Sequence, residues 1–255
     1  SPPSLFLHPT LMRSPLAEVF GYPYSTLSRR ATQVREHTSC PFKVRGSQCI
    51  KDKKDDPLGV CSIHHEGAPI ITCPVQFEKD RVVFRDASAF FFGTAENVEV
   101  IPEARLRTSD GTSAGNIDFV PARMREGEIV DFGALEIQLV YISGNVREPF
   151  ERYMKDPRAW NRVDWNQDSA KRPRPDYLSS SQKRLVPQII QKGRILGAWC
   201  KKQAVAIQSE FYATLPSVER VPQRESNLAW LIYDLQPADD VLVLQHQTTV
   251  YTTYG

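Results

Sequence analysis

The sequence predicts an α/β fold in which a mixed central sheet is flanked by helices. The main observation is the order of elements expected in the second half of the chain: a hairpin, a helix and then further strands. A composition of 41% hydrophobic and 24% charged residues is ordinary for a folded globular protein. A third observation is the segment 40–74, which is rich in glycine, proline and cysteine and has too little apolar periodicity to fold unaided.

Each element is expected from a local pattern. Residues 14–35 mix apolar and polar side chains and predict short helical pieces that are broken at Pro23. Ser181 can cap a longer helix that has Pro187 near its start and carries Ile189, Ile190, Leu196 and Trp199 at helical spacing. The remaining expectations are strands at 115–120, 133–141, 204–212, 228–235 and 241–251, a short helix at 147–155, and an extended basic loop at 171–175.

The strand expected at 133–141 follows the one at 115–120 through a charged turn at 123–128, and the two should form a hairpin. Side chains alternate between the two faces of a strand, so Glu136 and Gln138 point the same way. Two polar groups therefore lie side by side on one face.

Net charge and hydropathy exclude some classes of partner. The net charge of +2 results from 32 basic and 30 acidic residues, so any surface for a polyanion must be local. No apolar run approaches the roughly 18 residues that span a bilayer, and the N-terminus lacks the layout of a secretion signal. We therefore expect a cytoplasmic protein with no membrane partner. From its length, we expect the chain to fold as one domain over 1–255.

Asp118 at the end of one strand and Glu136 and Gln138 on the next match the layout of a metal-dependent phosphodiesterase site. Hydrolysis of a phosphodiester needs Mg²⁺ to neutralise the phosphate and activate a water, and two carboxylates supply the hard oxygen ligands that hold it. Gln138 lies on the same face and can orient that water. The alternative is a set of solvated strand residues, because such a pattern is common.

Four of the five cysteines, Cys40, Cys49, Cys61 and Cys73, fall in the segment 40–74. In a cytosolic protein this clustering favours a metal over disulfides. Four thiolates suit a tetrahedral structural site for zinc or iron, with His64 and His65 as rival ligands, while unrelated buried thiols are the alternative. We expect Cys200, on the apolar helix, to be a core residue.

Two of these patterns resemble the NotI-type restriction endonucleases of the PD-(D/E)xK superfamily. The cysteine pattern is similar to that family's cysteine motif. It consists of TSCPF at 38–42, CIK at 49–51, GVC at 59–61 and CP at 73–74. The stretch FGALEIQ at 132–138, preceded by Asp118, resembles its active-site strand, including a glutamine where the superfamily usually has lysine. Weaker similarities lie at 16–21 and 227–234, so the resemblance spans most of the chain.

The resemblance implies a restriction-endonuclease-like core and a Mg²⁺-dependent type II enzyme that cuts double-stranded DNA. Asp118 and Glu136 would bind the catalytic metal and Gln138 would face the water, with 40–74 as a subdomain in which the four cysteines hold one structural iron or zinc ion. It also implies a homodimer acting on a GC-rich palindrome and a companion DNA methyltransferase.

Two other functions remain open. One is a sequence-specific DNA-binding protein whose carboxylates are relics, and the other is a defence nuclease of the same fold that acts on modified DNA. Basic and amide side chains are the candidate DNA contacts, and the alternative for each is an ordinary solvated surface group. These candidates are Arg45, Gln48, Lys51, Lys53, Lys54, Arg172 and Arg174.

Overall fold

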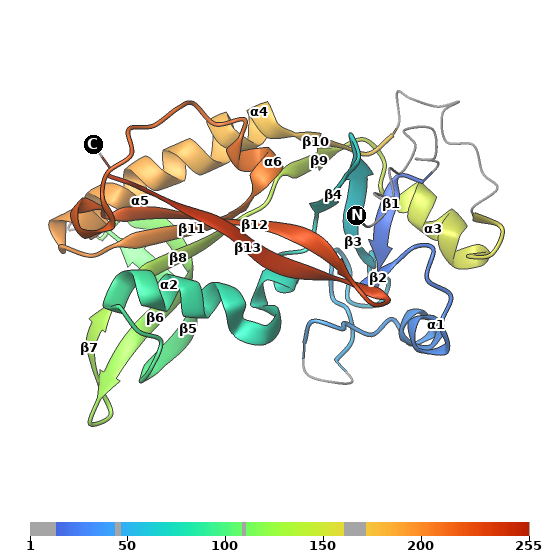
Figure 1. Ribbon diagram of the computed structural model, residues 1–255, viewed down its shortest axis with the longest axis horizontal. Coiled ribbons are helices and arrows are strands. Elements are labelled where there is room, and N and C mark those ends of the chain that lie inside the picture. The colour runs from blue at the N-terminus through green and yellow to red at the C-terminus, as the bar shows by residue number, and fades with distance from the viewer. Residues whose placement is uncertain (1–13, 44–46, 109–110, 161–171, 255) are drawn as a thin grey trace, which may run out of the picture. The chain divides into compact units, whose positions relative to one another are not determined.

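The structure is a computed structural model that describes residues 14–43, 47–108, 111–160 and 172–254 (Figure 1). The chain divides into two compact units, each of which is described by itself. Unit 1 consists of Ser1–Cys73, Ile142–Pro175 and Pro237–Val243. Unit 2 consists of Pro74–Tyr141, Asp176–Gln236 and Leu244–Gly255.

Unit 1 contains a four-stranded sheet in the order β2-β1-β3-β4. Its strands are β1 (Leu16–Val19), β2 (Tyr22–Pro23), β3 (Val60–His65) and β4 (Ala68–Ile71). Helices α1 (Arg29–Glu36) and α3 (Arg147–Lys155) belong to the same unit. Buried Leu16, Val19 and Ile63 form part of its core, so the sheet is built from the apolar residues of two distant stretches of chain.

The helical pieces expected over 14–35 are wrong for the first part of that stretch. Leu16 and Val19 lie in β1, which pairs antiparallel with β3. The partner strand is distant in sequence, so local periodicity could not reveal it. A helix begins only at Arg29, where the side chain of Ser28 accepts a hydrogen bond from the backbone N–H of Ala31.

Unit 2 contains most of a seven-stranded mixed sheet in the order β13-β12-β11-β8-β6-β5, with β7 paired to β6. Strands β8, β11 and β12 run parallel, while β6 pairs antiparallel with β5 and β8. The expectation of a mixed sheet is therefore confirmed. The strands are β5 (Val98–Arg107), β6 (Ser113–Arg125), β7 (Glu128–Phe132), β8 (Ala134–Gln138), β11 (Gln203–Gln208), β12 (Leu228–Ala238) and β13 (Val241–Thr252).

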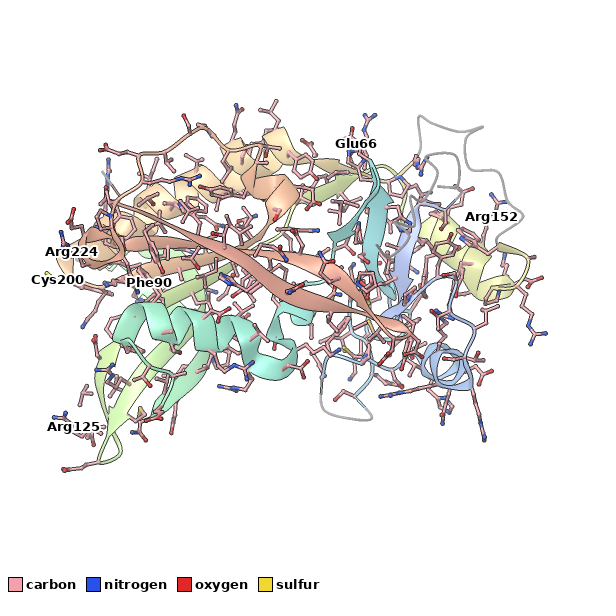
Figure 2. The ribbon with its side chains drawn as sticks, in the orientation of Figure 1. Glu66, Phe90, Arg125, Arg152, Cys200 and Arg224 are labelled. Atoms are coloured by element: carbon pink, nitrogen blue, oxygen red, sulfur yellow. The ribbon has the colours of Figure 1, made fainter. Side chains whose placement is uncertain are left out.

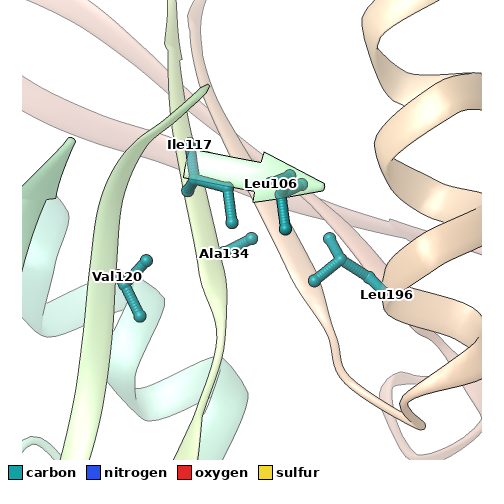
Figure 3. Packing of buried hydrophobic residues seen from close by; sticks show 5 residues of the cluster. All are labelled: Leu106, Ile117, Val120, Ala134 and Leu196. Atoms are coloured by element: carbon teal, nitrogen blue, oxygen red, sulfur yellow. The ribbon is translucent and has the colours of Figure 1, made fainter. Parts of the chain in front are cut away.

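Helices α2 (Val82–Phe92) and α5 (Val186–Ala198) flank this sheet on opposite faces (Figure 1). On the α5 face, Leu196 packs with Leu106, Ile117, Val120 and Ala134 in one apolar cluster (Figure 3). On the α2 face, the rings of Phe84 and Phe119 lie 4.9 Å apart. Both faces of the central strands are thus covered, which explains their nearly continuous burial.

Several expected boundaries change in the structure. Strand β7 intervenes in the expected hairpin, and β8 ends at Gln138, before β9 (Tyr141–Ser143), which pairs with β10 (Arg174–Asp176). The strand expected at 204–212 ends at Gln208, because Ser209–Tyr212 form α6. The helix expected at 147–155 is confirmed as α3.

The expected N-terminus of the long helix is corrected as well. Asp176, rather than Ser181, caps a short helix, α4 (Tyr177–Ser180), and a π-helical turn then leads into α5. Pro187 lies in the first turn of α5 as expected. Cys200 is exposed just beyond the end of α5, so its expected core role is wrong (Figure 2). Among the described residues, no helix is long and apolar enough to cross a membrane.

Candidate active site

Strands β6 and β8 bring Asp118 and Glu136 together. The antiparallel register pairs Phe119 with Leu135, so Asp118 lies opposite Glu136 on the same face of the sheet. The backbone N–H of Ile137 donates a hydrogen bond of 2.9 Å to Oδ2 of Asp118. The strand pairing therefore places the two carboxylates side by side, and the hydrogen bond from β8 holds the side chain of Asp118.

The carboxylate of Glu136 is buried, with 7% of its side chain exposed. Burial raises the pKa of Glu136 to about 7, the Lys192 ammonium opposes that rise, and the charge of Asp118 adds to it. Its Oε1 atom has no hydrogen-bond partner among the described residues. A buried carboxylate oxygen without a partner is unfavourable unless a water, a cation or another ligand completes it.

Lys192 of α5 is the residue of this site that the sequence-based reasoning missed. Its Nζ donates a hydrogen bond of 2.7 Å to Oε2 of Glu136, and only 4% of its side chain is exposed. A signal was present in the helix: Lys192 shares one stripe with Leu185, Ile189 and Leu196, of which the two leucines are buried. A lysine on the core face of a helix indicates a buried partner of opposite charge.

Gln138 lies two residues after Glu136 and therefore on the same face of β8. Its side-chain Nε2 donates a hydrogen bond of 2.7 Å to the backbone carbonyl of Leu139. With the amide nitrogen engaged in this way, the side-chain oxygen is the atom suited to accept a hydrogen bond from water.

The donor set at this site fits a hard divalent cation. Asp118 and Glu136 offer carboxylate oxygens, and Oε1 of Glu136 is the buried atom that lacks a partner. In the part of the chain that the structure describes, no three His, Cys, Asp or Glu side chains gather to hold a metal. A Mg²⁺ ion here would thus take its remaining ligands from water and substrate phosphate, which is the usual coordination of Mg²⁺.

The four cysteines of segment 40–74 lie in unit 1 as two neighbouring pairs. An antiparallel bridge between Ser39 and Gln48 brings Cys40 near Cys49. A hydrogen bond of 2.8 Å from the N–H of Thr72 to the carbonyl of Cys61 places Cys73 beside Cys61. None of the five cysteines is in a disulfide, and Cys40, Cys61 and Cys73 are buried.

Lys51 belongs to the surroundings of these cysteines rather than to an open surface. Its ammonium donates hydrogen bonds to the carbonyl of Val60 at 2.5 Å and to Oγ1 of Thr72 at 2.8 Å. Within the described residues no three or more His, Cys, Asp or Glu side chains are arranged so that they could hold a metal ion.

A cleft of about 950 Å³ lies in unit 1 between α1 and the start of the cysteine segment. Among the described residues that line it, several carry cationic or amide side chains and none carries a carboxylate, and such side chains bind phosphates and base edges. The polar side chains that line it include Arg30, Gln33, His37, Lys43 and Gln48.

The expected DNA contacts are found in different surroundings. Gln48 lines the cleft. Lys51 is turned inward, as described above. Lys53, Lys54 and Arg174 are exposed and Arg172 is half-buried, while Arg45 lies outside the described residues. Sequence composition alone did not distinguish the inward lysine from the exposed ones.

The site has two acids paired on neighbouring strands of a mixed sheet and a buried lysine beside them. This arrangement is suited to a nuclease. The chain belongs to the family of restriction endonuclease NotI, whose family model matches residues 18–247. The resemblance inferred from the sequence is thereby confirmed, and the family implies site-specific cleavage of double-stranded DNA. No curated protein and no solved structure matches the chain.

Proposed function

We propose that this protein is a type II restriction endonuclease with a restriction-endonuclease-like core, which cuts both strands of DNA by Mg²⁺-dependent hydrolysis. The observation that carries the proposal is the pairing of Asp118 with Glu136 across β6 and β8. The buried Oε1 of Glu136, which lacks a hydrogen-bond partner among the described residues, supports a cation at this place. Family membership supports the choice of DNA as the substrate.

In this mechanism each side chain has a separate task. Asp118 and Glu136 would bind Mg²⁺, which supplies Lewis-acid stabilisation of the phosphate and lowers the pKa of an attacking water. Gln138 would accept a hydrogen bond from that water through its side-chain oxygen and so orient it. Gln138 adds no positive charge to the site.

We propose that one structural iron or zinc ion is bound by the four cysteines Cys40, Cys49, Cys61 and Cys73. Segment 40–74 would then be a metal-binding subdomain of a nuclease domain over 1–255. Support comes from the two neighbouring pairs of free thiols and from the absence of helices and strands between residues 40 and 59 among those described there. Binding would require the two pairs to draw together. Sulfur ligands accept either metal.

The active assembly is proposed to be a homodimer, because a double-strand cut at a palindrome uses two sites related by two-fold symmetry. The target is proposed to be a GC-rich palindrome, and a companion DNA methyltransferase would protect the host's own copies in the cytoplasm. The cleft of unit 1 supports contact with DNA through Arg30, Lys43 and Gln48.

The decisive experiment is digestion of a complex DNA with the purified protein and Mg²⁺, followed by sequencing of the new ends. A single sequence at all ends, with a fixed stagger, supports the proposal. Ends scattered over many sequences but concentrated in modified DNA support a defence nuclease instead. Specific binding without any cleavage supports a DNA-binding protein whose carboxylates are relics, and it contradicts the enzyme.

A further inference from the structure

The active-site strand lacks the lysine that the wider superfamily carries two residues after its glutamate, and Gln138 stands there. The structure nevertheless contains a lysine at this site. Lys192 reaches Glu136 from α5, on the face of the sheet that this helix covers. The two charged groups are 2.7 Å apart, and both side chains are almost fully buried.

The fold fixes Lys192 in this position. Leu196, one turn further along α5, is fully buried in the apolar cluster with Val120 and Ala134. Gly193 lies so close to the ring of Tyr254 that an added Cβ would be 2.6 Å from a ring carbon. A Cβ added at Gly115 of β6 would be 3.8 Å from Cε of Lys192, so the lysine stem passes along that strand.

The pairing divides the two oxygens of Glu136 between different partners. Lys192 binds Oε2, while Oε1 is buried and has no hydrogen-bond partner among the described residues. An ion pair formed only for stability is more favourable when the remaining oxygen is also satisfied. A buried Oε1 that has no hydrogen-bond partner is instead expected where a further ligand binds the carboxylate.

We propose that Lys192 is a positioning residue that replaces the missing strand lysine: it orients Glu136 through Oε2 so that Oε1 faces the metal. This inference rests on the nuclease function proposed above. The positive charge that the superfamily places on the active-site strand would here come from a helix packed against it, and Gln138 would be free to serve the water alone.

The test compares wild-type protein with Lys192→Met, Lys192→Arg and the double variant Gln138→Lys/Lys192→Met on DNA that carries the mapped target. The matched control is Lys201→Met, because Lys201 forms a similar 2.7 Å pair with Asp131 in the same unit. Three quantities are measured: the cleavage rate with Mg²⁺, the binding of Ca²⁺ to the uncut protein–DNA complex by calorimetry, and the melting temperature.

We expect Lys192→Met to lower both cleavage and Ca²⁺ affinity by about 10- to 100-fold, as is typical when the group that orients a metal ligand is removed. Lys192→Arg should retain more of both, and Gln138→Lys should restore part of the cleavage lost in Lys192→Met. The control Lys201→Met should cleave and bind Ca²⁺ like the wild type. A purely structural role would give no such rescue by a lysine on β8.

A folded Lys192→Met variant that cleaves and binds Ca²⁺ like the wild type overturns the inference. Should that variant not fold, Lys192→Arg decides: a folded arginine variant as inactive as Glu136→Ala also overturns it. Wild-type protein that never cuts DNA contradicts the proposed function itself. Wild-type cleavage with an inactive Glu136→Ala and a fully active Lys192→Met contradicts the role of Lys192 alone.

Discussion

Asp118 and Glu136 in unit 2 and the four cysteines in unit 1 were both expected to bind metals, but the fold holds the two sets differently. The acids lie on paired strands, and the backbone N–H of Ile137 on β8 also holds the side chain of Asp118. Three of the four cysteines lie outside helices and strands, and among the described residues no group of three or more His, Cys, Asp or Glu side chains could hold a metal. A catalytic site can be assembled by a sheet, whereas a loop-rich segment needs its metal to become a site.

The largest effect expected is that of Glu136→Ala. Loss of this ligand should lower cleavage by about 100- to 1,000-fold or more, the range seen when a group that stabilises transition-state charge is removed. Binding of specific DNA should stay intact or become tighter, because a negative charge facing the phosphate is gone. Cleavage rates and binding by fluorescence anisotropy measure both. Undiminished turnover would refute the site assigned to unit 2.

The second prediction concerns the cysteine segment. Cys61 is buried and its Sγ accepts a hydrogen bond of 3.2 Å from the N–H of Gly21. Cys61→Ser should lower the melting temperature by several degrees, since each 1 kcal/mol of lost stability shifts it by roughly 2–4 °C in a domain of this size. DNA affinity should fall with it, because the loop loses its cross-link.

Elemental analysis completes that prediction: carefully prepared protein should hold about one iron or zinc ion per chain, as four thiolate ligands imply. The matched control is Cys200→Ser, because Cys200 is an exposed free thiol of unit 2. It should melt and bind metal like the wild type. Metal-free protein, or a Cys61→Ser variant that melts normally, would show that the cysteines are merely buried thiols.

A third prediction concerns the cleft of unit 1. Arg30→Ala or Lys43→Ala should each weaken DNA binding and reduce the slope of log affinity against log salt by about 0.9 if one phosphate contact is lost. Arg152→Ala on α3, an exposed arginine of the same unit that is labelled in Figure 2, is the control. An unchanged slope in both cleft variants would remove the cleft from the DNA surface.

The smallest effect is expected for Gln138→Lys in otherwise wild-type protein. The change introduces the residue that the wider superfamily uses at this position, so partial cleavage should remain. A second ammonium near Lys192 would compete for Glu136, which is why full activity is not expected. Rates at several Mg²⁺ concentrations measure the loss. An unfolded product would show that position 138 is a packing position rather than part of the chemistry.

The sequence by itself determined several local features of unit 2. Alternation along 133–138 placed Glu136 and Gln138 on one face, and Pro187 marked the first turn of α5, because these patterns depend only on the geometry of one element. The order of elements was enough to predict a mixed sheet flanked by helices, since strands joined by a hairpin and strands joined by a helix run in different relative directions. The rare combination of patterns identified the family.

Tertiary structure alone decided which groups meet. Leu16 and Val19 joined a strand because β3 lies beside them. Lys192 entered the site from a helix that is distant in sequence from Glu136. Each of these outcomes depends on a partner far along the chain, and no local pattern encodes how a long-range contact satisfies a buried charge or a backbone hydrogen bond.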